Sequence, residues 1–165
     1  MRHTLIALME DKPRVLNRIS SLFSRRNYNI ESLSVGHSET PGVSRMTIVL
    51  NGDDRVLEQV VKQLSKLVNV IQVLDVGERP SVVRELALIK IKADTETRSR
   101  IIELTDIFRA KVVDVGVTSL TVEITGPESK VNSLVDLLQP YGIEELARTG
   151  RLAMLRNGSR VADAV

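Results

Sequence analysis

Few side chains in this 165-residue chain are of types that catalyse reactions. The two histidines, His3 and His37, have no second candidate ligand at helix or turn spacing, so structural or solvated roles are favoured over metal binding. Glu10 and Asp11 could form a general-acid pair, but acids beside an expected helix start more often favour the helix dipole. The chain has no cysteine, no glycine-rich phosphate loop and no Gly-x-Ser-x-Gly elbow. The sequence therefore predicts no catalytic residues and no metal site.

The same region could instead hold a small zwitterion. Glu10-Asp11-Lys12-Pro13 links an expected strand to an expected helix, and backbone N–H groups at a helix start attract a carboxylate. The α-amino group of the ligand would need acceptors opposite. The amide of Asn29, beside the apolar Ile30, could supply one if a second copy of the chain brought it near. Taken alone, Asn29 is more often a simple turn or strand-start residue.

The elements expected in the first half place this junction in a βαββαβ unit. A strand-like run spans Thr4 to Met9, and apolar residues at helical spacing predict a helix from about Pro13 to Arg26. Asn27, which tolerates left-handed backbone, marks the change to the next strand. The remaining elements are a strand to about residue 35, a hairpin loop over 36–42, a strand over 44–50, a turn over 51–54 that can cap a helix with an apolar face from Leu57 to Leu67, and a strand over 70–76. This order is that of a ferredoxin-like unit.

The same order begins again after the linker Gly77-Glu78-Arg79-Pro80-Ser81. Strands are expected near residues 86–91, 112–117, 120–124 and 143–147, with helices between the first two and the last two. A weak internal duplication is the simplest account. We therefore expect an α+β protein of two ferredoxin-like βαββαβ units, in domains 1–78 and 79–165. The tail from Arg148 has little periodicity and is expected to be flexible and loosely ordered.

Composition excludes several kinds of partner. Hydrophobic residues make up 42% of the chain and aromatic residues only 2%, so an aromatic platform for stacking bases is not expected. A net charge of +2 gives no strong field for nucleic acid. The sequence shows no long apolar segment and no signal peptide, so no membrane contact is expected. Lack of cysteine fits a reducing cytoplasm, which is the expected location.

Three segments resemble the small, regulatory subunits of acetolactate (acetohydroxyacid) synthase, which carry an ACT domain. They are Glu10-Asp11-Lys12-Pro13, the run from Leu22 to Val35, and Ser44-Arg45-Met46-Thr47-Ile48. The resemblance continues less sharply to cover nearly the whole chain, through Arg84-Glu85-Leu86, Asp106-Ile107-Phe108-Arg109 and Ala147-Arg148-Thr149-Gly150.

This resemblance implies a function. The first half would be an ACT domain that dimerises and senses valine. The chain would activate the large, catalytic subunit of acetolactate synthase, which converts two pyruvates to 2-acetolactate and CO2, and would make it subject to feedback inhibition in branched-chain amino-acid synthesis. Thiamine diphosphate, magnesium and FAD are expected on that catalytic partner, and no cofactor is expected in this chain.

The resemblance also implies an effector site at a homodimer interface, where the sheets of two protomers join edge to edge. The residues that match are Asp11, Lys12, Pro13, Val15 and Leu16 from one protomer and Asn29 and Ile30 from the other. The family usually has glycine after Pro13, whereas this chain has Arg14, which we include in the site.

Arg14 is the departure that matters most. Glycine lets a carboxylate approach the backbone, whereas arginine adds bulk and a permanent charge. Arg14 could pair outward with Glu10 or Asp11, obstruct the pocket, or contact the carboxylate itself. We expect a weakened response to valine. Asn27, at another position where the family usually has glycine, still accepts left-handed backbone.

Other functions remain open at this point. A free-standing amino-acid-binding or gene-regulatory ACT protein would need no catalytic partner. RNA binding is suggested by the strand order of the RRM, but the strands lack its aromatic cluster. An acylphosphatase-like enzyme shares the fold, and analogy of fold alone is a poor reason to assign a function.

Overall fold

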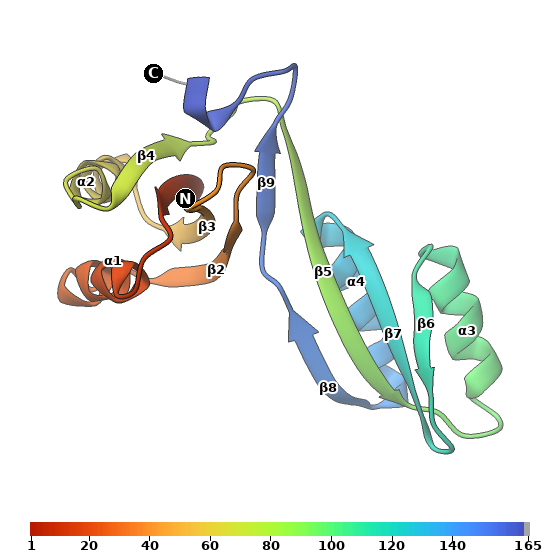
Figure 1. Cartoon of the computed structure of the whole chain (residues 1–165). Coiled ribbons are helices and arrows are strands. Elements are labelled where there is room, and N and C mark those ends of the chain that lie inside the picture. Colours follow the sequence, from red (N-terminus) through yellow and green to blue (C-terminus); the bar gives the residue numbers. More distant parts are fainter. Residues whose placement is uncertain (164–165) are drawn as a thin grey trace. The chain divides into compact units, whose positions relative to one another are not determined.

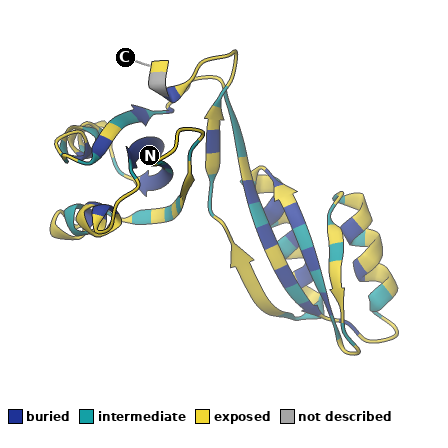
Figure 2. Cartoon of the chain, viewed as in Figure 1, coloured by how far each residue is buried: buried dark blue, intermediate teal, exposed yellow. Residues whose placement is uncertain are grey.

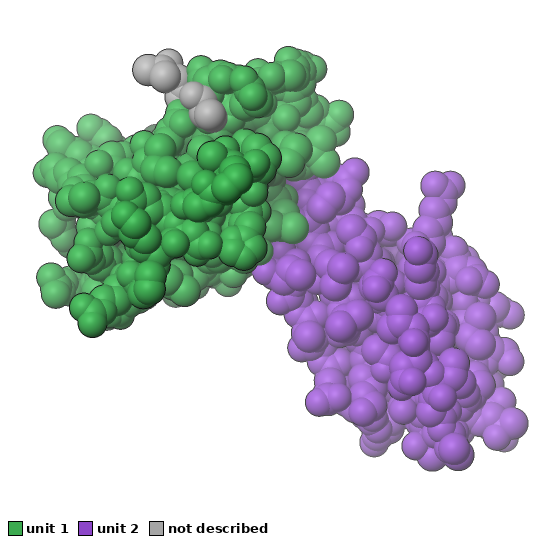
Figure 3. Space-filling view, viewed as in Figure 1, with its two compact units in different colours: residues 1–82, 151–165 green, residues 83–150 purple. Residues whose placement is uncertain are grey.

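A computed structural model of the chain describes residues 1–163. The chain forms two compact units (Figure 3). Unit 1 contains residues 1–82 and the C-terminal segment from residue 151, and unit 2 contains residues 83–150. Each unit has the order βαββαβ and an antiparallel sheet, which confirms the predicted pair of ferredoxin-like units.

Unit 1 begins with a four-stranded sheet and two helices (Figure 1). Its elements are β1 Arg2–Glu10, α1 Val15–Arg25, β2 Ile30–His37, β3 Val43–Asn51, α2 Asp54–Leu64 and β4 Val70–Asp75. The strand order is β2-β3-β1-β4, so β2 and β4 are the edge strands. Helix α1 starts two residues later than predicted because Pro13 and Arg14 form a turn. At its other end, Asn27 has a φ of 56°, the left-handed conformation that was predicted.

The core of unit 1 lies between the helices and one face of the sheet. Val15, Ile19 and Phe23 recur on one side of α1 and are buried. They pack with residues such as Leu5 of β1 and Ile48 of β3. The spacing that predicted α1 is therefore the spacing that holds it against the sheet.

Unit 2 repeats this plan. Its elements are β5 Ser81–Lys92, whose first two residues belong to unit 1, α3 Arg98–Ile107, β6 Lys111–Val115, β7 Ser119–Gly126, α4 Glu128–Leu138, the short 3-10 helix η1 Gln139–Tyr141 and β8 Ile143–Arg148. The strand order is β6-β7-β5-β8 and corresponds strand for strand to that of unit 1.

The duplication extends to single backbone hydrogen bonds. At the end of β1, Asp11 N–H donates to Gly42 O at 2.9 Å, and at the end of β5, Ala93 N–H donates to Thr118 O at 2.9 Å. One residue earlier, the N–H groups of Glu10 and Lys92 donate to Asn69 O and Gly142 O, each at 2.9 Å. These equivalences align the β1–α1 junction with the β5–α3 junction.

The C-terminal segment departs from the predicted loose tail. It contains strand β9 Leu152–Leu155, which pairs with β5, and the 3-10 helix η2 Val161–Asp163. Arg45 of β3 donates from Nη2 to Ala153 O at 2.7 Å, so the segment lies against the sheet of unit 1. The predicted domain 79–165 thus differs from unit 2, because the chain returns to unit 1 after Gly150.

This return explains a contrast in burial (Figure 2). All six residues from Thr4 to Met9 in β1 are buried. Leu5, Ala7 and Met9 face the helices, whereas Thr4 lies on the other face, where Arg151 Nη1 donates to Thr4 Oγ1 at 3.0 Å. In β5, buried residues alternate with more exposed ones from Glu85 to Lys92, as expected when helices cover only one face.

No helix within residues 1–163 has the length and apolar character to cross a bilayer.

Candidate functional site

The predicted effector site lies where β1 ends and α1 begins. Lys12 N–H donates to Glu10 O at 3.0 Å, and Pro13 has no N–H to donate. Arg14 then turns the chain into α1 with φ 73° and ψ −6°. This left-handed conformation costs a non-glycine residue about 1–2 kcal/mol. The structure therefore gives a backbone reason why glycine suits this position better than arginine.

The start of α1 leaves backbone donors open. The helix has no side-chain cap and no acidic residue in its first turn. The N–H groups of Arg14, Leu16 and Asn17 donate to no acceptor within residues 1–163, and Val15 N–H makes only a long 3.5 Å contact with Lys12 O. Open N–H groups at the positive end of a helix form a site for a carboxylate.

The acids beside these donors already have partners. Asp11 Oδ2 lies 3.2 Å from His37 Nδ1, at the end of β2. Glu10 Oε2 lies 2.9 Å from Lys12 Nζ and accepts from Asn69 Nδ2 at 2.7 Å. The hydrogen bonds from Lys12 and then Asn69, with the charge of Lys12, hold the pKa of Glu10 below its ordinary value. His37 and Asn69 thus belong to the junction, although the sequence pattern did not identify them as site residues.

These pairs exclude one of the orientations considered for Arg14, an outward ion pair with Glu10 or Asp11. Glu10 and Asp11 are engaged by Lys12 and His37, and no ion pair joins either acid to Arg14 in the described chain. The Arg14 side chain is exposed at the mouth of the junction. An incoming carboxylate would therefore meet a guanidinium beside the open N–H groups.

The structure brings together only part of the predicted site. The residues that are exposed at the junction are Asp11, Lys12, Pro13, Arg14 and Leu16. Val15 is only 4% exposed and belongs to the core, so its side chain supports the helix. Asn29 and Ile30 follow the far end of α1, whose 11 residues span about 16 Å. Within a single copy they do not reach the junction.

The equivalent junction in unit 2 is filled by its own side chains. Asp94 Oδ1 accepts from Thr97 N–H at 2.8 Å, from Glu96 N–H at 2.9 Å and from Thr97 Oγ1 at 3.0 Å. These hydrogen bonds, those from Thr97 first, hold the pKa of Asp94 below its ordinary value. A carboxylate of the chain itself therefore occupies the start of α3.

Arg98 completes this closure. Its Nη2 donates to Gly116 O at 2.8 Å and to Val117 O at 2.9 Å, so carbonyls of the neighbouring hairpin are also occupied. A side chain of unit 2 thus binds the N–H groups just before α3, whereas no side chain of the described residues caps the start of α1.

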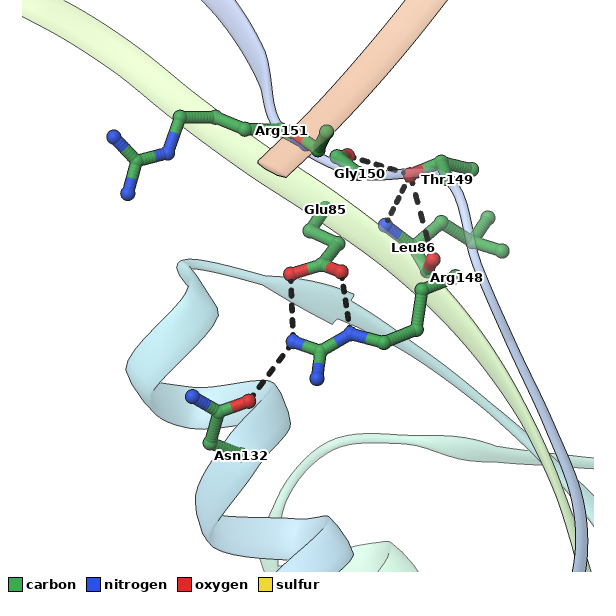
Figure 4. Close-up of polar contacts among 8 residues, drawn as sticks. Glu85, Leu86, Asn132, Arg148, Thr149, Gly150 and Arg151 are labelled. Carbon is green, nitrogen blue, oxygen red and sulfur yellow. Dashed lines mark hydrogen bonds and ion pairs between the residues drawn. The ribbon is translucent and has the colours of Figure 1, made fainter. Parts of the chain in front are cut away.

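Two of the segments that carry the family resemblance, Arg84-Glu85-Leu86 and Ala147-Arg148-Thr149-Gly150, lie side by side in unit 2 (Figure 4). Arg148 of β8 binds Glu85 of β5 through two contacts, and Arg148 Nη2 also donates to Asn132 Oδ1 at 2.8 Å. Beside them, Leu86 N–H donates to Thr149 Oγ1 at 3.1 Å. Glu85 is buried and engaged on both oxygens, which is a structural arrangement and not a catalytic one.

Within residues 1–163, no three His, Cys, Asp or Glu side chains lie close enough together to hold a metal ion.

Comparison with known proteins gives consistent results for both units. Residues 84–157 match the family model described as the small subunit of acetolactate synthase, and residues 5–72 match the AHAS small subunit-like ACT domain. A probable acetolactate synthase small subunit of Archaeoglobus fulgidus is 53% identical over 97% of this chain and 100% of its own length. The acetolactate synthase small subunit of Mycolicibacterium smegmatis is 55% identical over 93% of this chain and 91% of its own.

A solved structure agrees with these sequence matches. The acetolactate synthase small subunit of Thermotoga maritima superimposes with a TM-score of 0.89 and 43% identity, over 96% of this chain and 99% of that one. Similarity of sequence and of structure thus extends across both units.

Proposed function

Because this chain belongs to the family of acetolactate synthase small subunits, we propose that it binds the catalytic large subunit, activates it and makes it inhibitable by valine. The large subunit would carry thiamine diphosphate, magnesium and FAD and convert two pyruvates to 2-acetolactate and CO2. The complex would be cytoplasmic, in keeping with the absence of cysteine. The chain itself would contribute regulation and no catalytic residue.

The observation that carries the sensing role is the open start of α1. The unpaired N–H groups of Arg14, Leu16 and Asn17 can bind the carboxylate of an amino acid, and the helix dipole favours its negative charge. The exposed Leu16 offers an apolar surface for an aliphatic side chain. The equivalent site in unit 2 is occupied by Asp94, so sensing belongs to unit 1.

A second copy would supply the opposite wall of the site. Strand β2 is an edge strand, and Leu33 and Val35 are exposed on the face that they share with the core residues Ile48 and Met46. We propose that β2 pairs antiparallel with β2 of the partner subunit. An unpaired edge with exposed apolar residues favours such pairing.

This pairing would complete the predicted set of ligand contacts. A two-fold axis between Leu33 and Ser34 sets Ile30 of the partner subunit opposite His37, and His37 lies against Asp11 at the junction. Asn29 of the partner subunit would then approach the open helix start, where its amide can accept from the α-amino group. Asn29 and Ile30 lie too far along their own chain to do this within one copy.

Arg14 would tune the response. Its guanidinium can bind a carboxylate by itself, but its bulk and left-handed backbone stand where a glycine would leave free access. We therefore propose that valine inhibits this enzyme less strongly than it would with glycine at position 14.

The direct test is to mix the purified chain with its large subunit and measure acetolactate formation with and without valine. We expect the chain to raise the rate and valine to reduce it. An unchanged rate, together with separate elution of the two proteins, would contradict the regulatory role. Activation without any effect of valine would support the proposed binding to the large subunit and contradict the proposed inhibition by valine.

A further inference from the structure

A cavity that shares no residue with the β1–α1 junction lies elsewhere in unit 1. Its volume is about 450 Å³. It lies between the linker before β5, which contributes Arg79 and Pro80, and the turn after β9, which contributes residues 156–160. Figure 1 shows the course of these two segments. Both walls belong to unit 1.

Positive charge predominates around this cavity. Three arginines line it, Arg79, Arg156 and Arg160, against one carboxylate, that of Asp163. Asp163 is paired with Arg160 through contacts of 2.9 Å and 3.3 Å. Arg156 donates from Nε to Ser81 O at 3.1 Å, and its Nη1 and Nη2 make no hydrogen bond with the residues that the structure describes. Arg79 has no side-chain hydrogen bond or ion pair within residues 1–163.

The backbone fixes the two walls with respect to each other. Arg156 N–H donates to Pro80 O at 2.9 Å, which ties the turn to the linker. Val161, just beyond the turn, is only 4% exposed and anchors it. Asn157 and Gly158 have φ values of 63° and 72°, and their N–H groups donate to no backbone acceptor in the described chain. Successive open N–H groups form a concave surface that favours anions.

We propose that this cavity binds the phosphate dianion of a small molecule. Guanidinium groups bind phosphate oxygens through paired N–H donors, and a dianion would balance the excess of arginine over aspartate. The cavity volume lies within the range of about 300–1,000 Å³ typical of small-molecule sites. It is larger than phosphate requires, so the organic part of a phosphate ester also fits. The site is independent of the proposed amino-acid site.

Calorimetric titration of the full-length chain tests this proposal. Inorganic phosphate and glycerol phosphate are the two probes, each at constant ionic strength set with sodium chloride. We expect saturable binding that falls at least tenfold in Arg79→Gln. Tighter binding of the ester would identify an organic phosphate as the ligand, and tighter binding of the free ion would identify inorganic phosphate. Arg55→Gln, an exposed arginine of α2 that does not line the cavity, is the matched control and should bind as the unaltered chain does.

Two results would overturn the proposal. One is a heat of titration no different from that of sodium chloride at equal ionic strength, and the other is equal affinity in Arg79→Gln. Since the Arg79 side chain has no intramolecular partner among residues 1–163, this variant should fold normally, which circular dichroism and thermal unfolding can verify.

Discussion

Arg148 Nε lies 2.6 Å from Glu85 Oε1, and Arg148 Nη2 lies 2.9 Å from Glu85 Oε2. The two residues are 63 positions apart and join strands β8 and β5 across the sheet of unit 2. Glu85 is only 6% exposed, so Arg148 supplies the counter-charge for a buried carboxylate.

Replacing Arg148 with methionine should therefore strongly destabilise unit 2. The buried Glu85 carboxylate would lose its counter-charge, and we expect the free energy of unfolding to fall by about 3 kcal/mol. Urea unfolding measures it. Glu145→Gln is the control, since Glu145 pairs with Lys90 on the same two strands but is exposed, and it should cost less than about 1 kcal/mol. Equal losses in the two variants would show that burial is not what makes the Glu85 pair important.

Arg14→Gly should stabilise the protein, whereas the same substitution at Arg25 should destabilise it. Arg14 has a positive φ, so glycine relieves about 1–2 kcal/mol of strain and loses about 0.5–1 kcal/mol to chain entropy. Arg25 is in the right-handed last turn of α1, where glycine costs about 1 kcal/mol. Thermal unfolding measures both changes.

The Arg14→Gly variant should also be inhibited at lower valine concentration when assayed with the large subunit. An unchanged inhibition curve would show that Arg14 does not belong to the valine site.

Val35→Lys should weaken self-association. Val35 is exposed on the edge strand β2, and a lysine there would set two charges near the proposed two-fold axis. Sedimentation analysis should show a dimer for the unaltered chain and monomer for the variant. Val68→Lys, a valine that is 89% exposed outside β2, is the control and should leave the dimer intact. A Val35 variant that remains dimeric would place the interface elsewhere.

Ala153→Glu should destabilise unit 1, although residue 153 is far in sequence from residues 1–82 of that unit. Ala153 is buried beside Arg45, so a carboxylate at this position would be forced against the sheet, at a cost of about 2 kcal/mol or more. Met154→Glu, one residue later on an exposed position, should change stability by no more than about 0.5 kcal/mol. Amide exchange resolves the effect by unit, and protection should fall at Ile6 before it falls at Ile89.

Acid should weaken the start of α3 through Asp94. Its pKa is depressed in the folded state by hydrogen bonds from Thr97 and Glu96, so its stabilising effect is complete above the unfolded pKa and is lost as the pH falls through the folded value. For an aspartate this loss lies below about pH 4. Asp94→Asn should flatten the acid limb of the stability curve, measured by thermal unfolding from pH 7 to pH 3. Asp136→Asn on α4, an aspartate with no side-chain hydrogen bond among residues 1–163, is the matched control for the loss of one carboxylate.

The sequence by itself determined the order of elements, the duplication and the left-handed joint at Asn27. These features depend on local patterns, namely apolar periodicity, turn residues and the tolerance of asparagine for positive φ. It also identified the β1–α1 junction, because a proline followed by the first helical residues has a local signature. The family resemblance added the expected partner and effector.

Only the tertiary structure decided which residues distant in sequence meet. The segment after Gly150 has little periodicity, yet it lies against the sheet of unit 1, and its Arg151 contacts Thr4 on the outer face of β1, which fits the unbroken burial from Thr4 to Met9. The pairing of Asp11 with His37 and the filling of the second junction by Asp94 likewise depend on strand register and on the conformation of a few side chains. Local propensity carries no information about contacts of this kind, because their free energy arises from burial and charge between segments that fold against each other.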